Sequence, residues 1–209
     1  TMNYTAQNLI NDVLYVFYVR AQCPNGSETS PWKKINFRTE CGAGISTLPY
    51  YEDFSSYGTG SYSNFPACWS RVSTAGSYPY ISSTGGNSLY LYPPAGYYTL
   101  AVAPALDPTI TASSVAMRFK MYAGSQSYIL KVGVMTDSSD ISTFVPVATF
   151  TPSATSVWEE KDVYFNSYSG TGQFIAFLSD ARTLASSNIV YIDEVNITPL
   201  PTCARPASL

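Results

Sequence analysis

The sequence predicts an all-β fold in which two antiparallel sheets pack face to face as a sandwich. Strand-like segments rich in β-branched and aromatic residues recur at intervals of roughly ten residues, joined by loops of Ser, Gly, Pro and Asn. Hydrophobic residues make up 45% and charged residues 12% of the chain, with 18 tyrosines, a balance typical of strand-rich extracellular domains. No helical period of useful length is present, and helix is expected at most as a turn near residues 138–143.

The first 41 residues form an incomplete unit. The expected elements are a short strand at residues 3–9, a strand at 13–21, a turn at 24–27 and a second strand from Trp32 to near Cys41. Two or three strands without an opposing sheet are marginally stable in water. Glycines at 42 and 44 break the strand pattern, so residues 42–47 are predicted to be a linker.

A second domain is predicted over residues 48–198. Its expected strands lie at residues 48–54, 79–81, 89–91, 100–103, 115–121, 129–136, 144–150, 157–165, 173–178 and 188–197. Alternation directs Val115, Met117, Phe119 and Met121 to one side of their strand, and Leu130, Val132 and Val134 inward. We therefore expect these two strands to line the core.

The last of these strands raises a question about Asp193. Strict alternation places Ile189, Tyr191, Asp193, Val195 and Ile197 on one face. A carboxylate inside an apolar face needs a partner, because a buried unpaired charge is costly. The partner is either an arginine (Arg71 or Arg118), a cation or amide groups, unless the carboxylate only caps a loop. Alternatively, a β-bulge turns Asp193 outward and removes the need for one.

The opening segment resembles part of a fibronectin type III module. Leu9 followed by Tyr15, Phe17, Val19 and Ala21 resembles its tyrosine-corner strand, while Ser30-Pro31-Trp32 and Phe37-Arg38-Thr39 resemble its last strand. The resemblance implies that residues 1–41 are the C-terminal strands of a truncated module. Residues 201–206 resemble the start of another such module, so residues 199–209 are expected to be a linker and the start of a following module.

Residues 48–197 resemble the MAM-like jelly-roll domains of bacterial surface proteins, to which the gingipain-type cleaved adhesin domains are related. The resemblance is carried by Tyr51-Glu52-Asp53-Phe54, by Pro66-Ala67-Cys68-Trp69, by Gly133-Val134-Met135-Thr136-Asp137 with Phe144, and by Tyr191-Ile192-Asp193-Glu194-Val195. It implies an antiparallel jelly roll in an array that alternates with fibronectin type III modules. The implied role is adhesion or glycan binding at the cell surface or outside the cell.

The resemblance also implies a structural calcium site. In jelly rolls of this kind the first and last strands lie side by side, which brings Glu52 or Asp53 near Asp193. Neighbouring carboxylates repel unless a cation or an arginine lies between them, and Ca²⁺ takes such hard oxygen ligands. The expected ligands are Glu52, Asp53, Asn87 and Asp193. The sequence contains no EF-hand-like run of ligands.

The four cysteines, at positions 23, 41, 68 and 203, lack the spacing of a metal site. They indicate disulfides in an oxidising compartment, with buried free thiols as the alternative. The fibronectin-like layout implies that Cys23 and Cys203 have partners beyond this chain, which leaves Cys41 with Cys68. That bridge would contribute about 3–4 kcal/mol in the chain-entropy model and would fix the angle between modules.

Several function classes are excluded or disfavoured. The chain has no histidine, which excludes Ser-His-Asp and Cys-His catalysis and every His-ligated metal site. The adjacent carboxylates Glu159 and Glu160 face opposite ways on a strand and cannot form a glycosidase pair with each other. A net charge of −3 without a basic run disfavours nucleic acid, and the apolar runs are too short to span a bilayer.

Aromatic residues in the loops suggest a glycan site, because aromatic faces stack on sugars. The predicted glycan-binding residues are Trp69, Tyr97 and Tyr98. The alternative is that these rings only cover the rim of the sandwich. We therefore predict a non-catalytic adhesion or recognition domain of a multimodular secreted bacterial protein, with a glycan or a host or cell-surface protein as partner. The alternative is a carbohydrate-binding module attached to a glycan-degrading enzyme.

Overall fold

The computed structural model shows two compact units, residues 1–42 and residues 43–209. It describes residues 5–7, 9, 14–22, 29–38, 44–60, 64–66, 68–74 and 77–201. The first unit contains an antiparallel hairpin of β1 (Leu14–Val19) and β2 (Lys33–Arg38), as predicted. Residues 5–7 and 9 are in no strand, and the rest of the strand predicted at residues 3–9 lies outside the described residues.

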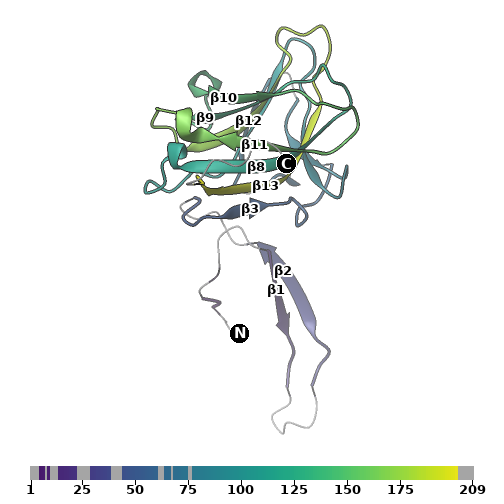
Figure 1. Cartoon of the computed structure of the whole chain (residues 1–209). Coiled ribbons are helices and arrows are strands. Elements are labelled where there is room, and N and C mark those ends of the chain that lie inside the picture. The colour runs from purple at the N-terminus through teal and green to yellow at the C-terminus, as the bar shows by residue number, and fades with distance from the viewer. Residues whose placement is uncertain are drawn as a thin grey trace, which may run out of the picture. The chain divides into compact units, whose positions relative to one another are not determined.

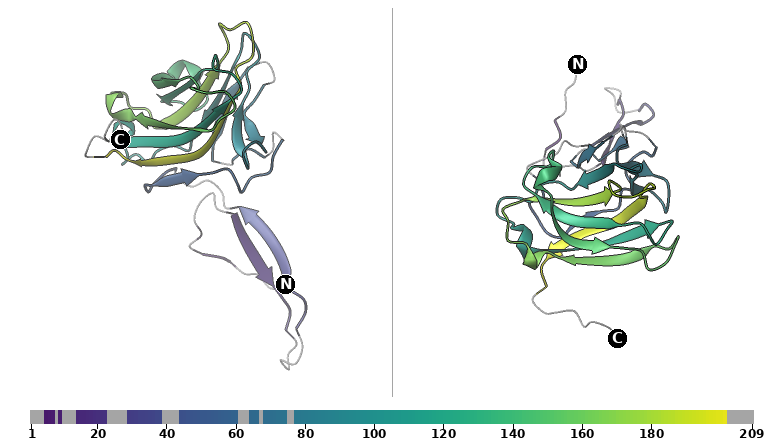
Figure 2. Two further views of the ribbon diagram at one scale, coloured as in Figure 1. Left: turned by 45° about the vertical axis from the view of Figure 1, so that its right-hand side comes forward. Right: turned by 90° about the horizontal axis from the view of Figure 1, so that it is seen from above.

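The second unit is an antiparallel sandwich of two sheets, which confirms the predicted fold class (Figures 1 and 2). The five-stranded sheet runs in the order β10 (Val145–Phe150), β9 (Leu130–Met135), β12 (Phe174–Asp180), β7 (Tyr98–Val102) and β4 (Ser70–Ser73). The six-stranded sheet runs in the order β11 (Glu159–Tyr164), β8 (Val115–Ala123), β13 (Val190–Pro199), β6 (Ser88–Leu91) and β5 (Tyr80–Ser82), and β3 (Tyr50–Glu52) also pairs with β13. The first and last strands of the sandwich therefore lie side by side, as expected.

Helix is limited to short 3₁₀ turns among the described residues, which agrees with the absence of helical periodicity. These turns include η2 (Ala112–Ser114), η3 (Ile141–Thr143) and η4 (Phe165–Ser167). The turn η3 falls within the predicted segment 138–143. No helix of the described residues is long and apolar enough to cross a membrane.

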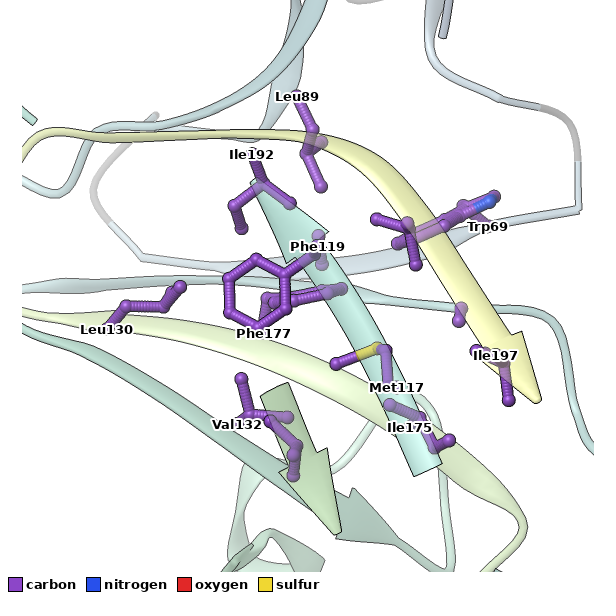
Figure 3. Packing of buried hydrophobic residues seen from close by; sticks show 14 of the residues in the cluster. Trp69, Leu89, Met117, Phe119, Leu130, Val132, Ile175, Phe177, Ile192 and Ile197 are labelled. Carbon is purple, nitrogen blue, oxygen red and sulfur yellow. The ribbon is translucent and has the colours of Figure 1, made fainter. Parts of the chain in front are cut away.

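The core lies between the two sheets and is built around aromatic rings (Figure 3). The ring centroid of Phe177 lies 5.2 Å from that of Phe119 and 6.2 Å from that of Trp69, and Phe54 packs on Trp69 at 5.4 Å. The inward residues predicted for β8 and β9 are all buried. Alternation was therefore enough to identify the core-facing side of these two strands.

The strand β13 departs from alternation at a β-bulge. Asp193 pairs with Lys120 and Asn196 with Arg118, so β13 uses three steps where β8 uses two, and Glu194 has a left-handed φ of 49°. The residues that reach the core are Val190, Ile192, Val195 and Ile197. The prediction that Tyr191 and Asp193 face the core is therefore wrong, and the bulge considered as the alternative is confirmed.

A second apolar cluster covers the outer face of the five-stranded sheet. Its buried members are Leu100, Val102, Met135, Ala176 and Leu178. Ile141 and Phe144, from the segment that contains η3, pack against them. Gly133 permits this close approach, because a Cβ atom there would overlap the Phe144 ring and the carbonyl oxygen of Val145. The five-stranded sheet is thus covered on both faces at this place.

Candidate functional site

The bulge of β13 places two carboxylates beside Lys120. Lys120 Nζ lies 2.6 Å from Glu194 Oε1, while Asp193 Oδ1 accepts a hydrogen bond from the N–H of Glu194 at 2.7 Å. Burial raises the pKa of Asp193 to about 6, and the negative charges of Glu194 and Asp53 act in the same direction. The hydrogen bond from the N–H of Glu194 and the charge of Lys120 act in the opposite direction. Asp193 is therefore less readily ionised than an ordinary aspartate, and a nearby cation would counteract this effect.

The other predicted calcium ligands lie near this bulge but are engaged in local hydrogen bonds. Glu52 accepts from the N–H of Phe54 at 2.7 Å and from the Tyr57 hydroxyl at 3.1 Å. Asp53 Oδ1 accepts from the N–H and the hydroxyl of Ser55, at 3.0 and 2.7 Å. Asn87 Nδ2 donates to the Tyr57 carbonyl oxygen at 3.0 Å.

These side chains do not form a ready ligand shell as they stand. Within the described residues there is no group of three or more His, Cys, Asp or Glu side chains that could hold a metal ion. A calcium ion would require Glu52 and Asp53 to exchange their hydrogen bonds for the metal. Calcium at Glu52, Asp53, Asn87 and Asp193 therefore stays a prediction.

The arginines predicted as partners of Asp193 have other neighbours. Arg118 Nε donates to Asp162 Oδ1 at 2.8 Å, across the β8–β11 pair. Arg71 donates to the Pro79 carbonyl oxygen at 3.3 Å, and its guanidinium lies over the ring of Phe65. The outward turn at the bulge is thus what accommodates Asp193.

A row of aromatic side chains crosses the outer face of the six-stranded sheet. Its members are Tyr80 on β5, Tyr90 on β6, Tyr191 on β13, Tyr122 on β8 and Trp158 just before β11. Each pair of neighbouring tyrosines in this aromatic row lies directly opposite in the strand register. Successive ring centroids are 4.8, 4.8, 5.5 and 5.4 Å apart.

The rings of the aromatic row are half-buried. Burial raises the pKa of Tyr80 and, to a greater extent, of Tyr90, so both phenols stay neutral at physiological pH. Sequence reasoning missed the aromatic row as a unit, because the strict alternation assumed for β13 placed Tyr191 in the core. The sequence does show a tyrosine in each of four strands, but only the strand register shows that these tyrosines lie opposite one another.

The three predicted glycan-binding residues do not share a surface. Trp69 is only 4% exposed and packs in the core, where its Nε1 donates to the Tyr50 hydroxyl at 3.0 Å. The prediction that Trp69 contacts a glycan is therefore wrong, because its ring is enclosed by Phe54 and Phe177. Tyr97, 42% exposed, and Tyr98 lie at the start of β7, and glycan binding by this pair stays a prediction.

Cys68 is disulfide-bonded, and the other three cysteines lie outside the described residues. The pairing of Cys41 with Cys68 thus stays a prediction.

The two adjacent glutamates of β11 do face opposite ways: the side chain of Glu159 is 13% exposed and that of Glu160 is 60% exposed.

No family model and no curated protein sequence matches the chain. Among solved structures, the K1 cleaved adhesin domain of Lys-gingipain from Porphyromonas gingivalis W83 is similar at 16% identity and a TM-score of 0.55, over 74% of this chain and 100% of that one. The K3 domain of the same protein is similar at 16% identity and a TM-score of 0.55, over 71% and 96%. An arabinose-bound GH51 α-L-arabinofuranosidase is similar at 12% identity and a TM-score of 0.51, over 76% of this chain and 27% of that one. These likenesses show a shared sandwich fold.

Proposed function

We propose that this chain carries a non-catalytic recognition domain of the adhesion type, in a multimodular secreted or cell-surface bacterial protein. The aromatic row is the observation that carries the proposal. Tyrosine and tryptophan are enriched in binding surfaces, because each offers a large contact area with few rotatable bonds. Paired strands hold these rings in fixed positions, which suits a surface used for binding.

Two further observations support this assignment. The charged groups beside the aromatic row are engaged in ion pairs, Lys120 with Glu194 and Arg118 with Asp162, and the chain has no histidine. The disulfide at Cys68 favours an oxidising compartment outside the cytosol. The cleaved adhesin domains share the fold, and we extend their printed description, adhesin, to this chain only as a proposal. In the same way, we propose that the hairpin is the end of one fibronectin type III module, and that the chain after β13 is a linker to the start of a following one.

The alternative function is a carbohydrate-binding module attached to a glycan-degrading enzyme. The aromatic row favours it, because aromatic rings pack against the C–H faces of sugars, and the phenols of Tyr80 and Tyr90 are neutral. The arabinofuranosidase, which contains a similar fold as one part of a longer enzyme, gives a precedent for such an attachment.

Binding measurements with the full 209-residue chain and matched variants test the proposal. The chain is applied to a glycan array and to immobilised bacterial and host surface glycoproteins. We expect Tyr90→Ala and Tyr191→Ala to abolish binding, while Tyr97→Ala, which removes an exposed tyrosine at the start of β7 in the other sheet, leaves binding intact. Loss of binding in Tyr97→Ala alone would show that the predicted site at Tyr97 and Tyr98 binds the partner. Full binding by both Tyr90→Ala and Tyr191→Ala would refute the proposal.

A further inference from the structure

A groove lies on the same outer face, several residues along the strands from the aromatic row. Tyr51, Asn196, Arg118 and Asp162 lie opposite one another across β3, β13, β8 and β11. The groove has a volume of about 350 Å³. It is lined by Ala116, Met117, Arg118, Asp162, Tyr164, Asn196, Thr198, Pro199 and Pro201. This volume is within the range of about 300–1,000 Å³ found for small-molecule sites.

One atom of the groove residues lacks a hydrogen-bond partner. Asn196 Oδ1 is buried and accepts no hydrogen bond from the residues that the structure describes. Among those residues, the only other buried side-chain oxygen or nitrogen without a partner is Thr99 Oγ1, on β7. Buried polar atoms in native proteins are rarely left without a partner. Asn196 lines the groove, so a ligand that carries an O–H or N–H group there would complete the hydrogen bonding of this oxygen once a rotation of the Asn196 amide brings it to the groove surface.

The charged groups around Asn196 include one more acidic side chain than basic side chains. Arg118 makes a two-pronged contact with Asp162, from Nε at 2.8 Å and from Nη2 at 3.4 Å, and Glu160 Oε2 lies 4.0 Å from Nη1. The next pair along the sheet, Lys120 with Glu194, is also neutral overall. An anionic ligand would meet two acidic side chains for one arginine, so the charge balance disfavours an anionic ligand.

We propose that this groove binds one neutral sugar unit of a glycan, in which one ring hydroxyl donates to Asn196 and a neighbouring hydroxyl bonds to Arg118 and Asp162. A hydroxyl can donate and accept at the same time, and therefore fits between a carbonyl oxygen and an ion pair that offers both kinds of group. The Tyr164 ring, 40% exposed, and Pro199 supply apolar surface for the C–H side of the sugar.

The inference rests on the proposed recognition function and names its ligand class. On β8, Arg118 in the groove and Tyr122 in the aromatic row are four residues apart. At about 3.3 Å per residue this separates the two sites by about 13 Å along the strand, so one oligosaccharide can reach both. The groove would then select the sugar through hydrogen bonds, and the rings would add contact area.

The test is calorimetric titration of the full chain with hexasaccharides of glucose, mannose, galactose and xylose, and with a heparin hexasaccharide as the anionic comparator. We expect one of the neutral hexasaccharides to bind and the heparin fragment not to bind. Asn196→Leu should weaken that binding about tenfold or more. It should also leave the melting temperature unchanged or raised, because it removes a buried atom without a partner. Asn166→Leu, at an exposed asparagine outside the groove, is the matched control.

Tyr164→Ala gives an independent readout at an exposed position, in case Asn196→Leu does not fold. It should also weaken binding about tenfold. Wild-type affinity in both variants, or a preference for the heparin fragment, overturns the inference. If Tyr191→Ala abolishes glycan binding while both groove variants bind normally, the recognition function stands and the groove assignment fails. If only a protein partner is bound and no hexasaccharide is, the ligand class is wrong and the recognition function again stands.

Discussion

Asp193 lies opposite Lys120 in the register of β13 and β8, but the ammonium group of Lys120 pairs with the neighbouring Glu194. The bulge causes this exchange. The extra residue turns Glu194 toward the lysine and leaves Asp193 with the N–H of Glu194 as its hydrogen-bond donor. The carboxylate that seemed to need a partner in the core thus lies outside the core, yet its pKa is raised.

Replacing Asp193 with asparagine should stabilise the protein above pH 6. The pKa of Asp193 is about 6 in the folded chain, against a usual value of 3.8, so stability falls as the pH rises from about 4 to about 6. Asparagine removes this loss. We expect the melting temperature at pH 8 in EDTA to rise by about 2–4 °C, with little change at pH 3.5, where the carboxyl is protonated in both states. The exposed Glu160→Gln variant is the control, and a lower melting temperature for Asp193→Asn at pH 8 would contradict the explanation.

Calcium should stabilise the wild-type chain but not the Asp193→Asn variant if the predicted ligands bind it. A cation beside Asp193 would favour the ionised carboxylate and bind only the folded chain. We expect millimolar CaCl₂ to raise the melting temperature of the wild-type chain at pH 7.5, EDTA to cancel the rise, and Asp193→Asn and Glu52→Gln to abolish it. A melting temperature that is the same in CaCl₂ and EDTA would dismiss the calcium site, while leaving the sandwich and the aromatic row unaffected.

Glu159 should contribute stability that is lost in acid. Burial raises its pKa, but hydrogen bonds from Lys161 and from the N–H groups of Ala154 and Ser153 outweigh this and hold the pKa at about 2, below its usual 4.5. Its stabilising effect is therefore complete above pH 4.5 and declines toward pH 2. Glu159→Gln should cost about 1–3 kcal/mol at pH 7 in urea unfolding and show a shallower loss below pH 4.5. Glu160→Gln, at the exposed neighbour, should leave the wild-type acid profile intact.

Gly133→Ala should destabilise the chain through the outer apolar cluster. The new methyl group would overlap the carbonyl oxygen of Val145 and the ring of Phe144, which must then shift. Overpacking of this kind costs about 1–3 kcal/mol. Gly124→Ala is the matched control, because its added Cβ meets no atom within 4 Å. Equal unfolding free energies for the two variants would show that the contact of Phe144 with Gly133 is not close.

Sequence reasoning predicted the strands whose side chains alternate cleanly. The inward residues of β8 and β9 were identified because their alternation is uninterrupted, and the pairing of β3 with β13 followed from the jelly-roll resemblance. Along β13 the prediction from alternation was wrong, because the residue types at positions 193 and 194 do not indicate that Glu194 has a left-handed backbone conformation. The strand β4, Ser-Arg-Val-Ser, was missed because its sequence is short and polar and its pairing with β7 defines it.

The candidate site was less predictable than the fold. The aromatic row requires four tyrosines from distant parts of the chain to be aligned across neighbouring strands, and a shift of one residue in any strand would turn its ring to the other face. Trp69 was assigned to a glycan site by its residue type and its position after a loop, and only the packing on Phe177 places it in the core. Residue type alone thus indicated which chemistry is available, whereas register decided where it lies.

The second apolar cluster makes the outer face of the five-stranded sheet less accessible than the outer face of the six-stranded sheet. Where the segment that contains η3 lies on the five-stranded sheet, a partner would have to lift Ile141 and Phe144 before it could reach the strands beneath. The tyrosines and the charged side chains of the opposite sheet need no such displacement. A partner that binds without displacing side chains would therefore have to approach the six-stranded sheet from its outer face.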